Sequence, residues 1–200
     1  DALDHLARSG FQDAYRGDIA RELARDLEEM GSPVTRADLQ AYYATERVPL
    51  SLAHSHGTIH NMPPPTQGLA SLMILGIIDR LETLHGSVRP DTVAFIHRIV
   101  EATKRAFLVR DRFVTDFDRL DGDPLAFLRA DALKAEAMAV DMRRAMPWPH
   151  KAAPGDTIWM GAADSEGRVV SYIQSIYWEF GSGCVSRSTG FLMQKRGSSF

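Results

Sequence analysis

The sequence lacks the features that mark a disulfide-linked, membrane-spanning or nucleic-acid-binding chain. Cys184 is the only cysteine among 200 residues, so no disulfide can form within the chain. The longest apolar run is too short to cross a bilayer. The net charge of −3 is small and evenly spread, which disfavours nucleic acid and membrane partners. What remains is a globular chain, long enough to bury a sizeable core in one or two domains.

The histidines do not show the spacing of a metal site. His54 and His56 would place two imidazoles on one face of a strand, but no third ligand is evident. We therefore expect neither a metal nor another cofactor.

Hydrophobic periodicity predicts helices over most of the first 150 residues. Residues 18–30 form an amphipathic pattern with one apolar face, made by Ile19, Leu23, Leu27 and Met30. Further helices are predicted over 35–43, where Thr35 and Asp38 suit a capping box, and over 68–84, 90–112 and 131–144. The helix of 68–84 is apolar nearly all round, which is typical of a buried helix.

The long helix of 90–112 carries several specific expectations. Pro90 suits its first turn, and the apolar residues expected to face inward are Val93, Ile96, Val100 and Phe107. Glu101 and Arg105 have the spacing of a surface ion pair. We also expect Glu101 and Lys104 to serve as structural residues that form pairs within this half of the chain.

Two pairs of strands are predicted. Residues 48–54 and 58–61 flank a His56-Gly57 turn, and the prolines that follow Met62 end the second strand. The apolar runs 158–163 and 169–176 flank Asp164-Ser165-Glu166-Gly167, the pattern of two buried strands joined by a hairpin loop. Thr157 directly precedes that hairpin and follows an irregular run over 146–155. A β-branched residue at a strand start commonly has no chemical role, so position alone favours a structural threonine.

Several ordered motifs resemble those of the γ-glutamyltranspeptidase family. They are Thr35-Arg36-Ala37-Asp38-Leu39, the proline-rich segment Met62 to Gly68, the helix HRIVEATKRAFLVR at 97–110, Thr157 itself, the turn Asp164 to Gly167, Val170-Ser171, Phe180-Gly181-Ser182-Gly183 and Thr189-Gly190. The resemblance implies an α+β chain, part of the αββα sandwich of an amino-terminal nucleophile hydrolase. It further implies that 1–156 is the end of a large subunit, mostly helical, and that 157–200 is the β-rich start of a small subunit.

The resemblance gives Thr157 a catalytic role. It implies self-cleavage between Asp156 and Thr157, which frees an α-amine that can take the proton of the Thr157 hydroxyl. Ser175 stands where γ-glutamyl enzymes carry a threonine that contacts the nucleophile. Serine keeps the hydroxyl, so the resemblance implies a second catalytic residue; the alternative is a strand serine that faces solvent.

The expected substrate-binding residues depart from the γ-glutamyl pattern. Tyr177 and Ser199 stand where those enzymes place an asparagine and an aspartate for the amino acid head group. A substrate ammonium group would lose its charge partner beside a neutral serine. Lys195 and Arg196 instead add positive charge, and arginine suits a carboxylate; alternatively, both lie in a solvated turn. The segment 173–183 is similar to the oxamate amidohydrolase branch of the family.

Three functions follow, in order of preference. The first is a self-cleaving amidohydrolase acting on a small carboxylate-bearing amide such as oxamate. The second is γ-glutamyl transfer or glutathione hydrolysis, and the third is an uncleaved homologue that only binds or assembles. The expected partners are the amide and the rest of the polypeptide, in a heterodimer or heterotetramer of processed subunits. We expect a cytoplasmic location, with the periplasm as the alternative.

Overall fold

The computed structural model describes residues 1–148 and 158–199, and its chain forms two compact units. One unit combines residues 1–44 with 151–200, and the other spans 45–150. These units are defined by packing. The predicted boundary at Thr157 is instead a cleavage site, so the packing units do not test it. Among the helices so described, none is both long enough and apolar enough to cross a membrane.

The first unit begins with four helices: α1 (Ala2–Ser9), α2 (Asp13–Arg16), α3 (Asp18–Glu29) and α4 (Arg36–Ala41). The sequence analysis did not predict α1 and α2. The apolar face of α3 is confirmed for Ile19, Leu23 and Leu27, which are buried. Met30 is the C-cap residue of the helix and is 40% exposed, so the apolar stripe is not buried at this end. The capping box of α4 is present, because Thr35 and Asp38 each bond the other's backbone N–H.

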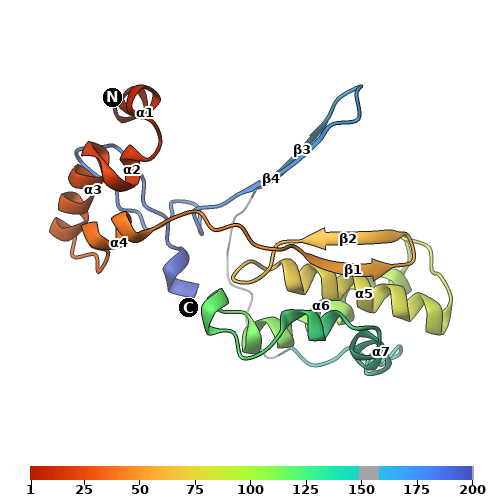
Figure 1. The fold of residues 1–200 in the computed structure, drawn as a ribbon. Helices are drawn as coiled ribbons and strands as arrows, with labels where there is room; N and C mark the ends of the chain where they lie inside the picture. Colours follow the sequence, from red (N-terminus) through yellow and green to blue (C-terminus); the bar gives the residue numbers. More distant parts are fainter. Residues whose placement is uncertain (149–157, 200) are drawn as a thin grey trace. The chain divides into compact units, whose positions relative to one another are not determined.

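The second unit is built around one apolar helix, α5 (Gly68–His85), which was predicted almost to the residue. It packs against the antiparallel hairpin of β1 (Leu50–His54) and β2 (Gly57–Asn61), and against α6 (Val93–Phe113) and α7 (Ala130–Met138) (Figure 1). Leu69, Leu72 and Ile77 are completely buried. Each such side chain stabilises the fold by about 1.5–3 kcal/mol relative to an exposed position.

The ends of several elements differ from expectation. β1 begins at Leu50 rather than at residue 48, and α7 ends at Met138 rather than near residue 144. Two short 3-10 helices, Phe117–Arg119 and Pro124–Leu128, connect α6 to α7. Pro90 precedes α6 instead of occupying its first turn, because the side chain of Thr92 caps the helix by accepting from Phe95 N.

The buried face of α6 is not the predicted one. Val93, Ile96 and Val100 are 88%, 55% and 42% exposed, and of the four predicted inward residues only Phe107 packs against the core. The face of α6 that is buried contains Ala102 and Ala106 instead. Small side chains there allow two helix backbones to approach closely, which the larger valine and isoleucine side chains would oppose.

Glu101 is also buried, and it does not pair with Arg105. Arg105 Nε bonds Glu136 of α7 at 2.6 Å, while Glu101 accepts from Lys104 Nζ at 2.7 Å and from Met146 N at 3.0 Å. Lys104 in turn donates to the carbonyl of Met146 at 2.7 Å. The structural pairing of Glu101 and Lys104 is thus confirmed, and together they hold both backbone polar groups of Met146.

The carboxyl-terminal hairpin consists of β3 (Ile158–Ala163) and β4 (Val169–Gln174). Its loop matches the prediction: Asp164 Oδ1 accepts from Glu166 N and Arg168 N at 3.0 Å each, and Gly167 has the positive φ of 82° that such a turn requires. The expectation of buried strands was wrong for this structure, since all residues of both strands are exposed. The apolar residues that suggested burial lie on strand faces that no described element covers.

Candidate active site

The predicted nucleophile lies just before the first described residue of the hairpin. Asp156 and Thr157 fall outside the described residues, whereas β3 begins at Ile158. The structure therefore informs the site through the residues around that position, chiefly the end of β4 and the segment 175–199 that follows it.

Ser175 is the first residue after β4, and its position follows from the register of the hairpin. The last described pair of the antiparallel ladder is Ile158 opposite Gln174. Ser175 is half-buried, and its Oγ accepts a hydrogen bond from Tyr177 N at 3.0 Å.

Tyr177 and Trp178, which we call the aromatic pair, have an unusual backbone. Their φ angles are 60° and 70°, in the left-handed region that residues other than glycine rarely adopt. The turn that begins at Trp178 is closed by Gly181 N, which donates to Trp178 O at 3.1 Å. Such strain persists only where surrounding contacts hold it, and it tends to gather at functional sites.

Lys195 and Arg196, which we call the cationic pair, lie over the two aromatic rings. Lys195 Nζ is 4.3 Å from the centroid of the Trp178 ring, and the Arg196 guanidinium carbon is 5.1 Å from that of Tyr177. Both separations are within the range of cation–π attraction. The amide of Lys195 also donates to Ile176 O at 2.9 Å. The predicted binding residues Tyr177 and Arg196, which are well separated in sequence, are thus brought together.

The cationic pair has no acidic partner in the part of the chain that the structure describes. Ion pairs there join other arginines and lysines to Asp and Glu, and none includes Lys195 or Arg196. Both side chains are half-buried. Ser199, the third predicted binding residue, ends the short 3-10 helix Arg196–Ser199. Within residues 1–148 and 158–199, no cluster of side chains suits a metal ion.

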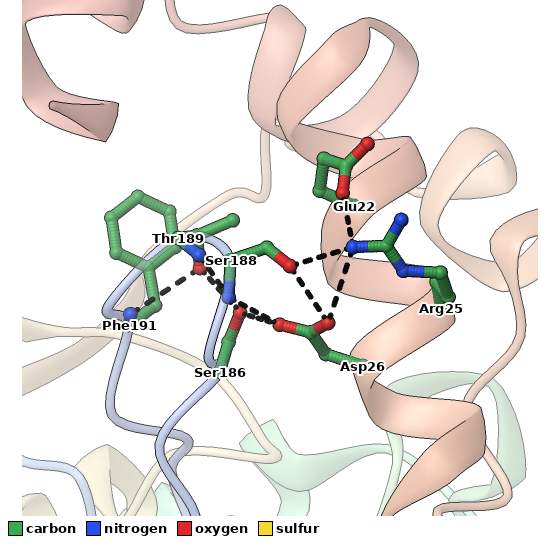
Figure 2. A network of polar contacts seen from close by, with 7 residues as sticks. All are labelled: Glu22, Arg25, Asp26, Ser186, Ser188, Thr189 and Phe191. Carbon is green, nitrogen blue, oxygen red and sulfur yellow. Dashed lines mark hydrogen bonds and ion pairs between the residues drawn. The ribbon is translucent and has the colours of Figure 1, made fainter.

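Asp26, which was not predicted from the sequence, is a buried carboxylate on α3 (Figure 2). Its oxygens accept from Ser186 Oγ at 2.6 Å, Ser188 N at 2.8 Å and Ser188 Oγ at 2.9 Å. The hydrogen bond from Ser186, followed by the others, holds the pKa of Asp26 below its ordinary value despite burial. An acidic residue beside Leu27 in an otherwise apolar stripe was the signal that could have revealed it.

Comparison with known proteins agrees with these observations. The family model described as gamma-glutamyltranspeptidase matches residues 1–200. The chain belongs to the γ-glutamyltranspeptidase family. It is 48% identical over 198 residues to an oxamate amidohydrolase proenzyme of Klebsiella pneumoniae, and 33% identical over 204 residues to a glutathione hydrolase-like proenzyme of Bacillus subtilis. Those alignments include 99% and 100% of this chain but only 37% and 38% of the relatives, so the chain spans well under half of their length.

Solved structures confirm the fold class. The cephalosporin acylase of Bacillus halodurans superposes with a TM-score of 0.83 at 30% identity, over 98% of this chain and 35% of that protein. The γ-glutamyltranspeptidase of Helicobacter pylori gives a TM-score of 0.64 at 21% identity, over 73% of this chain and 42% of the other. The chain is a mixed helix-and-sheet portion of the amino-terminal nucleophile hydrolase fold, and its relatives include proteins named oxamate amidohydrolase and glutathione hydrolase.

Proposed function

We propose that the full-length protein is an amidohydrolase that cuts itself between Asp156 and Thr157 and then cleaves a small carboxylate-bearing amide such as oxamate. In the first step the Thr157 hydroxyl attacks the Asp156 carbonyl, the peptide nitrogen leaves, and an ester links the two residues. Water hydrolyses that ester. The products are a carboxylate at Asp156 and a Thr157 that carries both a hydroxyl and a new α-amine.

Turnover uses the same hydroxyl. The α-amine has a pKa near 8 in its ordinary state, so it can accept the hydroxyl proton at neutral pH. The oxygen attacks the amide carbonyl, ammonia leaves with the proton, and water hydrolyses the resulting ester. From oxamate the products are ammonia and oxalate.

The register of the hairpin supports a partnership of Thr157 with Ser175. Ile158 is the residue after Thr157 in sequence, and it pairs with Gln174, the residue before Ser175. We infer that the Ser175 hydroxyl donates a hydrogen bond to the Thr157 hydroxyl and steadies it for attack.

The observation that carries the substrate assignment is the cationic pair, which forms no ion pair with an acidic residue of 1–148 or 158–199. Lys195 and Arg196 are half-buried and rest on the aromatic pair, so their charges are held in place. A fixed guanidinium without a carboxylate partner is suited to binding one from a ligand. The 48% identity to the oxamate amidohydrolase proenzyme supports the same choice.

The second candidate is hydrolysis or transfer of γ-glutamyl groups, which the names of other relatives favour. A γ-glutamyl substrate carries an α-ammonium group that needs an anionic partner. Tyr177 and Ser199 offer none, and the nearby Lys195 and Arg196 would repel it. We therefore rank this function second.

The test is a steady-state comparison of oxamate with a chromogenic γ-glutamyl anilide, using the full-length protein. We expect release of ammonia from oxamate and little release of the aniline. A site built around a charged ligand rejects an analogue that leaves a charge unpaired by several kcal/mol, which corresponds to about 10³-fold or more in kcat/KM. Faster turnover of the anilide would replace this proposal with the γ-glutamyl function.

The rest of the polypeptide is the expected partner of the described hairpin. Both faces of β3 and β4 are exposed, including Trp159 at 64% and Ile173 at 66%. We propose that the remaining chain covers these faces and that the processed pieces stay together as one enzyme. Limited exposure of the hairpin tryptophan in the full-length protein, measured by acrylamide quenching, would agree with this.

A further inference from the structure

The Asp26 network joins two segments that lie 160 positions apart in sequence. We define it as Arg25 and Asp26 of α3 with Ser186, Ser188 and Thr189 of the loop 185–192 (Figure 2). Asp26 is only 5% exposed and Ser186 is completely buried. Arg25 bonds Ser188 Oγ at 2.8 Å and Glu22 at 2.6 Å, and Thr189 Oγ1 donates to Ser186 Oγ at 2.7 Å.

This loop is the closed end of a small hairpin. Ser186 N donates to Phe191 O at 2.9 Å, Val185 and Leu192 form a bridge, and Met193 N donates to Cys184 O at 2.9 Å. Along the hairpin these pairs lie progressively farther from Asp26. Fixing the loop on α3 therefore also fixes the strand that leads to residue 194.

The open end of the hairpin leads directly into the cationic pair. Ser182 donates to Met193 O twice, from its amide at 2.9 Å and from its hydroxyl at 2.8 Å. At Gly181 a Cβ would lie 2.5 Å from Met193 O, so this close approach requires glycine. Two residues beyond Met193, the amide of Lys195 bonds Ile176 O beside the aromatic pair.

We propose that Asp26 is a positioning residue for substrate binding: it fixes the loop 185–192 on α3 and thereby sets the place of Lys195 and Arg196 over Tyr177 and Trp178. Asp26 does not touch the substrate in this account. The inference rests on the proposed function for the role of the cationic pair, but the positional part stands on the contacts alone.

A carboxylate suits this task better than a neutral residue. It accepts three hydrogen bonds at once, one of them from the fixed N–H of Ser188. Arg25 Nη2 lies 3.9 Å from Asp26 Oδ1 and also bonds Glu22 and Ser188. Removing the carboxylate leaves the buried hydroxyl of Ser186 and the amide of Ser188 without their acceptor, which loosens the loop.

The test compares Asp26→Ala and Asp26→Asn with Asp79→Ala in the full-length protein. Asp79 is the matched control, because it is also 5% exposed, also accepts a backbone N–H, and lies in the other unit. Hydrogen exchange is measured at the amides of Ser188, Met193 and Lys195 by fragmentation mass spectrometry. KM and kcat for oxamate are measured on the same samples.

In Asp26→Ala we expect exchange at all three amides to accelerate by about tenfold or more, as local opening becomes easier. KM for oxamate should rise about tenfold with kcat within about twofold, the signature of lost ground-state binding. Asp26→Asn keeps one acceptor oxygen and should give smaller changes of the same kind. Asp79→Ala should change neither the exchange of these amides nor KM.

Unchanged exchange at Lys195 would overturn the proposal, because Asp26 would then brace only its own loop. Faster exchange with an unchanged KM would overturn it equally. If Asp26→Ala does not fold, Asp26→Asn decides by the same measurements. If the unmodified protein does not hydrolyse oxamate, the substrate assignment fails, while exchange at Lys195 still decides whether Asp26 positions the cationic pair.

Discussion

At the scale of single residues, the aromatic pair shows what the sequence could and could not reveal. The motif marked Tyr177 as a departure from the γ-glutamyl pattern, and composition marked Lys195 and Arg196 as a basic pair. Neither indicated that two adjacent aromatic residues adopt positive φ angles, because each costs about 1–3 kcal/mol that only tertiary contacts can offset. The stacking of Arg196 on Tyr177 depends on that backbone.

We expect the carboxylate of the substrate to bind the guanidinium group of Arg196. Arg196→Ala should raise KM for oxamate by roughly tenfold to a hundredfold, since a hydrogen bond to a charged group contributes about 1.5–3 kcal/mol. The kcat value should fall less, if the contact is equal in the ground and transition states. Arg129→Ala is the control, because Arg129 is exposed and paired with Asp131. Equal effects of the two substitutions would contradict this role.

Ser175 should act through its hydroxyl. Ser175→Ala should lower kcat for oxamate on the order of 10²-fold, the typical cost of removing one catalytic hydrogen-bond donor. Ser175→Thr keeps the hydroxyl and should retain most activity. Ser171→Ala, in the preceding strand β4, should have little effect. If Ser175→Ala has the same kcat for oxamate as the unmodified enzyme, Ser175 has no chemical role.

At the scale of elements, periodicity predicted helices well and their buried faces less well. The all-apolar pattern of α5 left one interpretation, and the helix was found with its expected bounds almost unchanged. In α6 two faces competed: one with Val93, Ile96 and Val100, the other with Ala102 and Ala106. Close helix packing selected the small residues. A sequence pattern ranks faces by apolarity, whereas packing also depends on side-chain size.

The Glu101–Lys104 contact links α6 to the segment at Met146 and makes stability depend on pH. Burial by itself raises the pKa of Glu101, but the hydrogen bonds from Lys104 and Met146 N outweigh it, so the pKa lies below the ordinary 4.5. Because the folded pKa is the lower one, this contribution is complete above the unfolded pKa and is lost as pH falls through the folded pKa.

Glu101→Gln should therefore reduce the loss of thermal stability on acidification. We expect the decrease in Tm between about pH 5 and pH 3 to be smaller in this variant than in the unmodified protein, although its Tm at neutral pH is lower. Parallel curves for Glu101→Gln and the unmodified protein would show that Glu101 does not contribute in this way.

At the scale of the whole molecule, the family motifs predicted more than hydrophobic periodicity could. Their order along the chain indicated the family, which the match over residues 1–200 confirms. Periodicity alone could not foresee that residues 1–44 and the carboxyl-terminal segment form one packing unit, because the contacts of Asp26 with Ser186 and Ser188 connect distant parts of the chain. The apolar residues of β3 and β4 are exposed in the described chain, and on our proposal the rest of the full-length protein covers them.

The central claim is that one hydroxyl, that of Thr157, serves both self-cleavage and turnover. The most direct measurement is the intact mass of the purified full-length protein beside its Thr157→Ala variant, with oxamate hydrolysis assayed on both. We predict that the unmodified protein separates under denaturing conditions into two pieces, the second beginning with Thr157, and hydrolyses oxamate. The alanine variant should stay in one piece and be inactive, and Thr157→Ser should retain some of each activity. An alanine variant that still splits between Asp156 and Thr157, or still hydrolyses oxamate, would contradict the account.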